Sequence, residues 1–451
     1  MNIRQAKEQV RKTVEAYLEK DNRGRYRIPV EQQRPIFMIG APGIGKTAVM
    51  EQVSRELGLA FVSYSMTHHT RQSALGLPVI THKSFEGFEY DVTEYTMSEI
   101  ISSIYDEMKE TGKREGILFL DEINCVSETL IPSMLQFLQF KTFGRHRVPD
   151  GWVVVTAGNP PEYNRMVHEF DMVTMDRLKY IEVEPDYDAW RDYAIEKGVH
   201  PAVLSYLDLK PSNFFVAELS AEGRRYVTAR GWEDLSEMIR LLEHDDLGVD
   251  SGLAGQYIHH PVIAREFSAY YDLFLKYRSD YHIADILEGK APEEIRTRAS
   301  EAGVDERIAI CRLMLDAVYS DAAAVRDQEE ICLDLKKEKS PDLKAEVEKL
   351  RTMSGALQEK LHNMFDFAAG VFGEGNEMLI IVSELTVNSD ASNFISHYGS
   401  RDYFKYSDTL MFSERNKNIR RKFAEFENEL AESAGPEDSN GRGTEKEEDI
   451  R

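Results

Sequence analysis

Apolar runs alternate with helically spaced apolar positions through the first 185 residues. Strands of a parallel sheet are covered on both faces, so they read as unbroken apolar segments. Such segments predict strands at residues 36–39, 59–65, 117–120, 152–158 and 178–183. Helical spacing predicts helices at residues 3–20, 48–53, 100–108 and 130–138. This alternation predicts an α/β fold with a parallel sheet between helices.

The pattern changes after Pro185, where apolar and aromatic residues recur at helical spacing. We expect a core at residues 1–185 and a helical lid at 186–290. Residues 291–430 are rich in helix formers, and Ser340-Pro341 interrupts a heptad-like leucine spacing, which predicts a helical hairpin within an all-helical extension. Residues 431–451 are nearly devoid of apolar side chains and are expected to be disordered.

One segment of the core, from Met66 to about Gly87, has no clear periodicity. An aperiodic stretch of this length in a compact core is usually functional or inserted. His68 and His69 lie within it, but neighbouring side chains diverge on a regular element. We interpret them as polar loop residues rather than metal ligands.

A glycine loop joins the first predicted strand to the following helix. It reads Gly40-Ala41-Pro42-Gly43-Ile44-Gly45-Lys46-Thr47, with Ala48 next, and fits G-x-x-x-x-G-K-[ST]. Glycines let backbone N–H groups curl around a polyphosphate, and the helix N-terminus favours negative charge. We expect residues 40–48 to bind nucleotide, with Lys46 reaching the β- and γ-phosphates and Thr47 ligating Mg²⁺. A chance glycine loop is the alternative, and the strand-loop-helix setting argues against it.

Polar side chains end two other predicted strands. Asp121 and Glu122 follow the strand at 117–120, and Asn159 follows the strand at 152–158. Asp121 would complete the Mg²⁺ shell beside Thr47, and Glu122 would orient and polarise the attacking water. Asn159 would lie near the γ-phosphate, although Asn159-Pro160 is also an ordinary turn signal.

Composition restricts the partners and the compartment. Lys and Arg number 55 against 79 Asp and Glu, a net charge of −24, which argues against wrapping bulk duplex DNA but leaves room for a local basic channel. The 3 cysteines form no C-x-x-C pair and fit reduced thiols. The N-terminus has no apolar signal region, and no apolar run is long enough to span a membrane. A cytoplasmic protein is expected.

Together these motifs resemble the MoxR-like AAA+ ATPases. The resemblance rests on the glycine loop, residues 118–124, the strand end at 156–160 and the Asp176-Arg177 pair, and it covers about residues 1–290. The segment around residues 76–78 looks like the second-helix insertion shared with magnesium-chelatase motors, dynein-related modules and McrB-like GTPases. The resemblance implies an AAA+ P-loop NTPase core, ATP and Mg²⁺ as ligands, and a homo-oligomer, a hexameric ring. ATP rather than GTP follows from the resemblance alone.

The resemblance also implies roles for three residues. Asn159 matches sensor 1, Arg177 the arginine finger that enters a neighbouring subunit's site, and Arg230 sensor 2 of the lid. Leu178 stands where the family commonly has phenylalanine. Alternatives stay open: Arg165 for the finger, and Arg224 or Arg225 for sensor 2.

Three functions are weighed. The first is a MoxR-type chaperone that remodels a protein client or assists metal or cofactor insertion, with a von Willebrand factor A domain partner implied by resemblance. The second is a McrB-like or helicase-like nucleic-acid motor, for which Lys141, Arg145, His146 and Arg147 are the basic candidates, although such charges more often form a solvated turn or a subunit contact. The third, a scaffold that binds nucleotide without turnover, is opposed by Glu122 and Asn159. Residues 291–430 would dock a partner or client, or support the ring.

Overall fold

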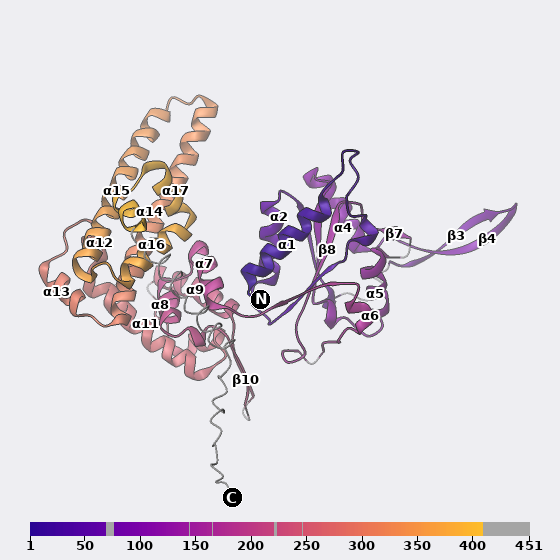
Figure 1. Ribbon diagram of the computed structural model, residues 1–451, viewed down its shortest axis with the longest axis horizontal. Helices are drawn as coiled ribbons and strands as arrows, with labels where there is room; N and C mark the ends of the chain where they lie inside the picture. The colour runs from indigo at the N-terminus through magenta and orange to yellow at the C-terminus, as the bar shows by residue number, and fades with distance from the viewer. Residues whose placement is uncertain (69–75, 144, 165, 221–222, 246, 409–451) are drawn as a thin grey trace, which may run out of the picture. The chain divides into compact units, whose positions relative to one another are not determined.

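The computed structural model describes residues 1–68, 76–143, 145–164, 166–220, 223–245 and 247–408 (Figure 1). The chain divides into two compact units, Met1–Lys276 and Tyr277–Arg451. None of the described helices is both long enough and apolar enough to cross a membrane.

A five-stranded parallel sheet forms the centre of the first unit, in the order β2-β5-β8-β1-β9. The strands are β1 (Ile36–Gly40), β2 (Ala60–Ser65), β5 (Gly116–Asp121), β8 (Trp152–Gly158) and β9 (Lys179–Val183). The five strands and the parallel α/β class expected from the sequence are thereby confirmed. Since all five strands run in the same direction, the carboxyl ends of β1, β5 and β8 meet at one edge of the sheet.

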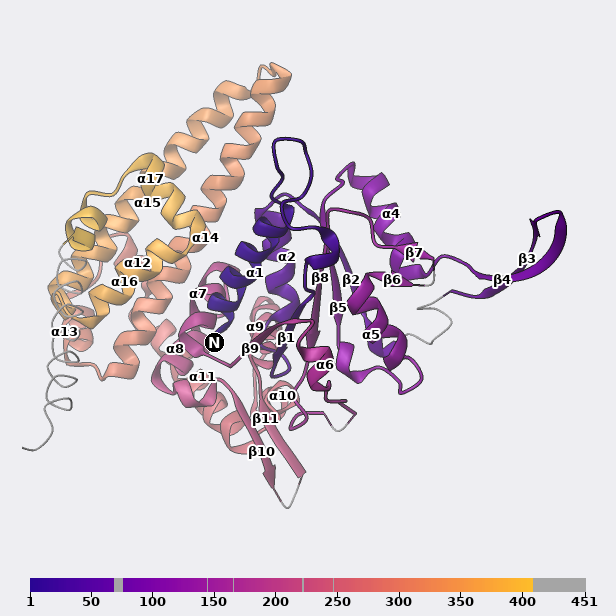
Figure 2. The same ribbon diagram turned by 45° about the vertical axis from the view of Figure 1, so that its right-hand side comes forward.

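Two hydrophobic cores lie on opposite faces of this sheet. Alternate residues of β1 point to opposite sides: Ile36 and Met38 belong to one core, and Phe37 belongs to the other. Helices α1 (Ile3–Leu18) and α2 (Lys46–Glu56) cover the first face, and α4 (Glu99–Thr111) and α5 (Ile131–Phe140) cover the second (Figure 2). The four predicted helices are therefore present.

The segment from Met66 to Gly87, which has no clear periodicity in the sequence, is in part regular, and its strand was not predicted. After the 3₁₀ turn Met66–His68, strands β3 (Pro78–Phe85) and β4 (Phe88–Tyr95) form an antiparallel ribbon that projects from the sheet (Figures 1 and 2). Most of its side chains are exposed on both faces, so no core selects an alternating apolar pattern. His69 lies outside the described residues.

The remainder of the first unit is mainly helical, as expected for the lid. Its helices are α7 (Tyr187–Lys197), α8 (Pro201–Leu209), α9 (Ala229–His244), α10 (Ser251–Tyr257) and α11 (Pro261–Tyr281), the last of which continues into the second unit. A hairpin of β10 (Val216–Ser220) and β11 (Gly223–Val227) interrupts them and was not predicted. Shorter elements precede β8 and β9: β6 (Thr142–Phe143), β7 (His146–Arg147) and α6 (Met172–Met175).

The named elements of the second unit are all helices, which confirms the helical extension. They are α12 (Ile283–Leu287), α13 (Glu293–Glu301), α14 (Val304–Glu338), α15 (Leu343–Phe372), α16 (Asn376–Val387) and α17 (Ser389–Tyr398). Helices α14 and α15 are the expected hairpin, and the turn between them contains Lys339 at φ 56° and Pro341. A fully buried ion pair joins Arg312 of α14 to Glu384 of α16. The expected disordered tail, residues 431–451, lies outside the described residues.

Candidate active site

The glycine loop closes around the start of α2. Gly43 and Gly45 adopt φ of +74° and +89°, a region that favours glycine, and α2 begins at Lys46. A Cβ at Gly43 would lie 3.0 Å from Cβ of Thr228, and one at Gly40 would lie 2.6 Å from the Val183 carbonyl oxygen. The loop is therefore packed closely enough to require glycine at both places, and the first N–H groups of α2 have no partner within the helix.

Lys46 is a buried cation, with 7% of its surface exposed. Its Nζ donates to the carbonyl oxygens of Gly40 and Ala41 at 2.8 and 2.9 Å, and to Asn159 Oδ1 at 3.0 Å. Burial lowers the pKa of Lys46 to about 8, although the Asp121 carboxylate opposes this shift. A buried ammonium beside a helix N-terminus suits a polyphosphate, which supplies the missing negative charge.

Thr47 and Asp121 bring two side-chain oxygen atoms together, and both are possible metal ligands. The Thr47 hydroxyl donates to Asp121 Oδ2 at 3.0 Å, and the Glu122 N–H donates to Asp121 Oδ1 at 2.9 Å. A hydroxyl and a carboxylate are hard oxygen ligands of the kind that Mg²⁺ prefers, so these residues fit the expected ion. When bound, Mg²⁺ supplies charge neutralisation at the β- and γ-phosphate oxygens.

Two hydroxyl groups, one at the end of β2 and one in the 3₁₀ turn that follows it, orient Glu122. Its Oε2 accepts from Ser65 Oγ at 3.1 Å and from Thr67 Oγ1 at 3.0 Å, while its backbone has φ 55°. A left-handed conformation is strained for glutamate and is common at functional sites. Sequence reasoning missed Ser65 and Thr67. Their signal is their place at or just after the end of a strand paired with β5, where Ser65 lies opposite Asp121.

Asn159 is held by a second asparagine that sequence reasoning did not single out. The Asn124 Nδ2 donates to the Asn159 carbonyl oxygen at 2.8 Å, and Asn124 Oδ1 accepts from the Asn159 N–H at 3.3 Å. A Cβ at Gly158 would lie 2.4 Å from this Oδ1. The clamp fixes the Asn159 backbone while the Asn159 side chain contacts Lys46.

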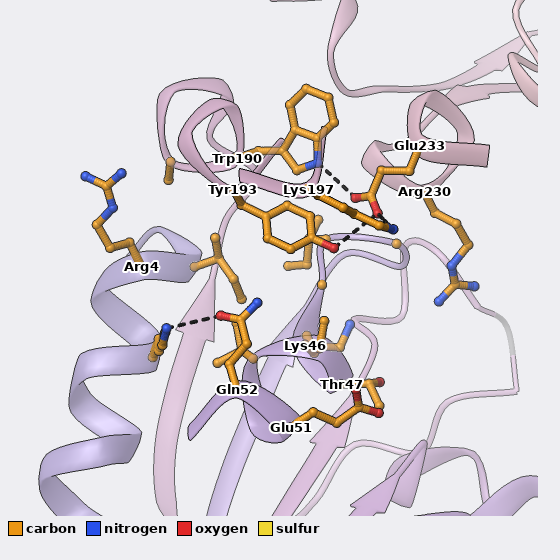
Figure 3. Close-up of a pocket in the computed structure, with 18 of the residues that line it drawn as sticks. Arg4, Lys46, Thr47, Glu51, Gln52, Trp190, Tyr193, Lys197, Arg230 and Glu233 are labelled. Carbon is orange, nitrogen blue, oxygen red and sulfur yellow. Dashed lines mark hydrogen bonds and ion pairs between the residues drawn. The ribbon is translucent and has the colours of Figure 1, made fainter. Parts of the chain in front are cut away.

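Arg230 lies beside the glycine loop at the start of α9. Its N–H donates to the Gly43 carbonyl oxygen at 3.3 Å, and Thr228 caps the helix by accepting from the Gly231 N–H at 3.2 Å. In Figure 3 the Arg230 side chain extends away from Glu233, towards the side where Lys46 and Thr47 lie. Its two rivals, Arg224 and Arg225, do not line the pocket, and Arg224 donates to the Tyr163 carbonyl oxygen at 3.1 Å.

Arg177, the proposed arginine finger, lies apart from these residues. Arg177 is exposed and donates to Gln139 Oε1 at 2.7 Å, and it does not line the pocket of its own subunit. Its rival Arg165 lies outside the described residues.

The other candidate residues lie in or beside one pocket of about 800 Å³. This volume is within the size range of small-molecule sites. Its lining includes Pro42 to Ala48, Asp121, Glu122, Asn159 and Arg230, whereas Gly40 and Ala41 contribute their carbonyl groups to Lys46. At the other end, Glu233 accepts from Trp190 Nε1 at 3.0 Å, Tyr193 OH at 3.4 Å and Lys197 Nζ at 2.9 Å (Figure 3). The pocket thus has a polar, cationic end and an end with two aromatic residues.

A comparison with a family model agrees with this geometry. Residues 35–178 match the AAA domain family of the dynein-related subfamily, and this segment contains the glycine loop, Asp121, Glu122 and Asn159. A solved structure of a "putative ATPase" from Cytophaga hutchinsonii ATCC 33406 is 14% identical, with a TM-score of 0.26 over 42% of this chain and 50% of that chain. A similarity of that size does not bear on function. The curated proteins contain no match. The matched segment is an AAA-type ATPase domain.

Proposed function

We propose that the chain is an ATP-hydrolysing AAA+ ring motor of the MoxR type. The observation that carries the proposal is the convergence of Lys46, Thr47, Asp121, Glu122 and Asn159 in one pocket, within a segment that matches an AAA domain. A buried cation, an oxygen ligand pair and an oriented carboxylate are the parts that phosphoryl transfer to water requires. The presence of Glu122 in this pocket favours turnover over passive nucleotide binding.

Each residue has a distinct task in this proposal. Lys46 and the backbone of residues 40–48 bind the phosphates, and Thr47 and Asp121 hold Mg²⁺. Glu122, oriented by Ser65 and Thr67, polarises the attacking water, which Asn159 helps to position. Arg230 contributes positive charge from the lid.

Arg177 of a neighbouring subunit would complete the site. Its exposed position away from its own pocket supports a role in trans and hence a homo-oligomeric, hexameric ring. A guanidinium stabilises the charge that spreads over the γ-phosphoryl oxygens. The use of ATP rather than GTP and the division into core (1–185), lid (186–290) and extension (291–430) belong to the same proposal.

The biological role that we propose is a cytoplasmic chaperone. It would remodel or activate a protein client, or assist metal or cofactor insertion, with a von Willebrand factor A domain partner. The family resemblance supports this role, and the three buried, unpaired cysteines fit a reducing compartment.

The basic residues that the nucleic-acid alternative would use already have partners within the chain. Lys141 is buried and donates to the Val30 carbonyl oxygen, Arg145 pairs with Glu94, and Arg147 pairs with Glu31. His146 contacts the Tyr95 carbonyl oxygen. Side chains already engaged by the protein's own acceptors are poor phosphate ligands, so these contacts favour a protein client.

Two substitutions test the catalytic proposal. Lys46→Ala should abolish nucleotide binding because it removes the cation from a buried phosphate site, whereas Glu122→Gln should bind ATP normally and hydrolyse it at least about a hundredfold more slowly. Equilibrium binding of labelled ATP and GTP, together with phosphate release, would be measured for both variants. Glu128→Gln, an exposed glutamate on the same loop, is the matched control and should behave as wild type. Normal hydrolysis by Glu122→Gln would refute the assignment.

A further inference from the structure

The far end of the β3–β4 ribbon exposes large apolar side chains. Phe85, Phe88 and Tyr90 are 53%, 68% and 52% exposed, and Ile80 is 69% exposed. Single exposed apolar residues are common, but three aromatic residues gathered at the end of a projecting ribbon are not. A two-stranded ribbon is also marginal in water without a covering surface.

The strand register places the three aromatic residues on one face. Phe85 lies opposite Phe88, and Lys83 lies opposite Tyr90. Because side chains alternate between faces, these four residues share a face, and the rings of Phe85 and Tyr90 are 6.1 Å apart. Ile80, which pairs with Thr93, lies on the opposite face.

The ribbon is acidic. Residues 78–95 contain four carboxylates, Glu86, Glu89, Asp91 and Glu94, and one lysine, Lys83. Glu94 pairs with Lys83 and Arg145, and Asp91 contacts His82. Within the described part of the chain, Glu86 and Glu89 form no ion pair. Glu86 follows Phe85 in the turn, and Glu89, opposite Ser84, lies on the face away from the three rings, so two unneutralised carboxylates lie at the end of the ribbon beside the aromatic face.

The base of the ribbon is fixed, so its end is presented in a defined direction. Thr96 N donates to the Leu77 carbonyl oxygen, and Leu77 N donates to Thr96 Oγ1, both at 2.9 Å. Gly76, at φ +91°, packs so closely that a Cβ there would lie 2.1 Å from the Thr96 carbonyl oxygen. Arg145, between β6 and β7, holds Glu94 at 2.7 Å. These contacts anchor the ribbon and leave its far end uncovered.

We propose that this far end docks a protein segment that carries both lysine or arginine and apolar side chains. Phe85, Phe88 and Tyr90 would cover the apolar side chains and contact cations over their rings. Glu86, in the turn beside the rings, would pair with a cation, and Glu89 would add negative charge from the other face of the same end. Nucleic acid and anionic membranes are disfavoured because they carry the same sign of charge as the ribbon. The proposal goes beyond ATP hydrolysis, since it uses no residue of the active site.

Peptide binding by the full chain tests this surface. The probe is a labelled peptide of alternating lysine and leucine, compared with one of alternating glutamate and leucine and with a DNA duplex. The double variant Phe85→Ser/Phe88→Ser should bind the lysine peptide at least about tenfold more weakly, as expected for loss of aromatic anchors. Ile80→Ser, equally exposed on the other face, is the matched control and should retain wild-type affinity. Glu86→Lys/Glu89→Lys should reverse the preference between the two peptides.

Other readouts separate this surface from the alternatives. All these variants should keep the wild-type rate of ATP hydrolysis, and Lys46→Ala should keep peptide binding, so a failed ATPase proposal would leave this test valid. Equal peptide affinity in the wild type and the Phe85→Ser/Phe88→Ser variant would overturn the proposal. Loss of DNA binding in that variant without loss of peptide binding would indicate nucleic acid instead. A changed sedimentation coefficient alone would make the ribbon a contact between copies of the chain.

Discussion

Asn124 is a neutral side chain on which the geometry of the active site depends. It is 2% exposed, and its amide engages both the N–H and the carbonyl group of Asn159. The neighbouring Gly158 leaves no space for a side chain between them. The Asn159 backbone is fixed in this way, so its Oδ1 stays within hydrogen-bond distance of Lys46.

We therefore expect Asn124→Ala to slow hydrolysis about tenfold or more while changing the KM for ATP little, because it releases Asn159 without touching the phosphate loop. Stability should fall by about 1–3 kcal/mol, the usual cost of leaving buried polar groups unpaired. Asn164→Ala, which loses contacts with the Cys125 thiol and the Met166 N–H but none with Asn159, is the control. Wild-type kcat in a destabilised Asn124→Ala protein would reduce Asn124 to a structural role.

Residues of this site could be predicted from the sequence where a local motif marks them, but not where only the strand order brings them to the site. Lys46, Thr47, Asp121, Glu122 and Asn159 follow buried strands in fixed motifs, and the sequence led to each of them. Ser65, Thr67 and Asn124 act on them only because β2 and β8 flank β5 in the sheet. Strand order is a tertiary property that no local pattern encodes.

A second buried lysine, Lys141, predicts a pH effect on stability. It is 4% exposed, and burial lowers its pKa from 10.5 to about 8. Below pH 8 the lysine is charged in both the folded and the unfolded chain, and the fold bears the full cost of burying the charge. Between about pH 8 and 10.5 the folded lysine is neutral while the unfolded lysine still holds its proton, so stability rises with pH.

Lys141→Met should lack this rise. From pH 7 to 10.5, the free energy of unfolding of the wild type should increase by about 3 kcal/mol relative to the variant, as the size of the pKa shift implies. Other groups titrate in both proteins and cancel in the difference. Urea unfolding at several pH values measures it, with the exposed Lys12→Met as the control. A constant difference between the wild type and Lys141→Met would contradict the prediction.

At the scale of elements, burial decided what could be predicted. The five sheet strands were recognisable because each packs against a core on one or both faces and carries a run of apolar residues. Most described side chains of the ribbon β3–β4 and the hairpin β10–β11 are not buried, and both elements mix charged with apolar residues, so period-2 alternation is weak in both. The weak pattern explains why the sequence predicted neither the ribbon β3–β4 nor the hairpin β10–β11.

The approach of the lid to the glycine loop gives a testable element-level effect. Gly43→Ala would place a Cβ 3.0 Å from the Thr228 Cβ, at the cap of α9. We expect ATP binding to weaken about tenfold or more, because the loop or the start of α9 must move. Gly112→Ala is a matched control: its φ is +70°, and nothing lies within 4 Å of the added Cβ.

Both alanine variants bear the strain of a left-handed residue, about 1–2 kcal/mol, which thermal unfolding would measure. Only Gly43→Ala should also lose ATP affinity. If the two variants bound ATP equally well, contact between the loop and the lid would have no part in nucleotide binding.

At the scale of the molecule, the pocket and the finger candidate lie apart. The pocket has Lys46, Glu122 and Arg230 in its lining, whereas Arg177 is exposed and bonded to Gln139. An exposed arginine outside the pocket of its own subunit has little effect on the charge of a phosphoryl group bound there. In a ring, the same arginine can enter the pocket of a neighbouring subunit. The assembly proposal therefore makes a prediction about mixtures of subunits.

Arg177→Ala alone should bind ATP and hydrolyse it about a thousandfold more slowly, the scale of a missing arginine finger. Mixed with Lys46→Ala subunits, it should recover activity, because an intact pocket of the first variant then receives Arg177 from the second. At equal amounts and random assembly, about a quarter of the pockets become complete. Lys46→Ala mixed with Glu122→Gln is the control: both defects lie in the pocket itself, so neither subunit can complete a site. Phosphate release measures recovery, and sedimentation confirms assembly. Rings that form without recovery would mean that Arg177 acts within its own subunit, and Arg165 would become the finger candidate.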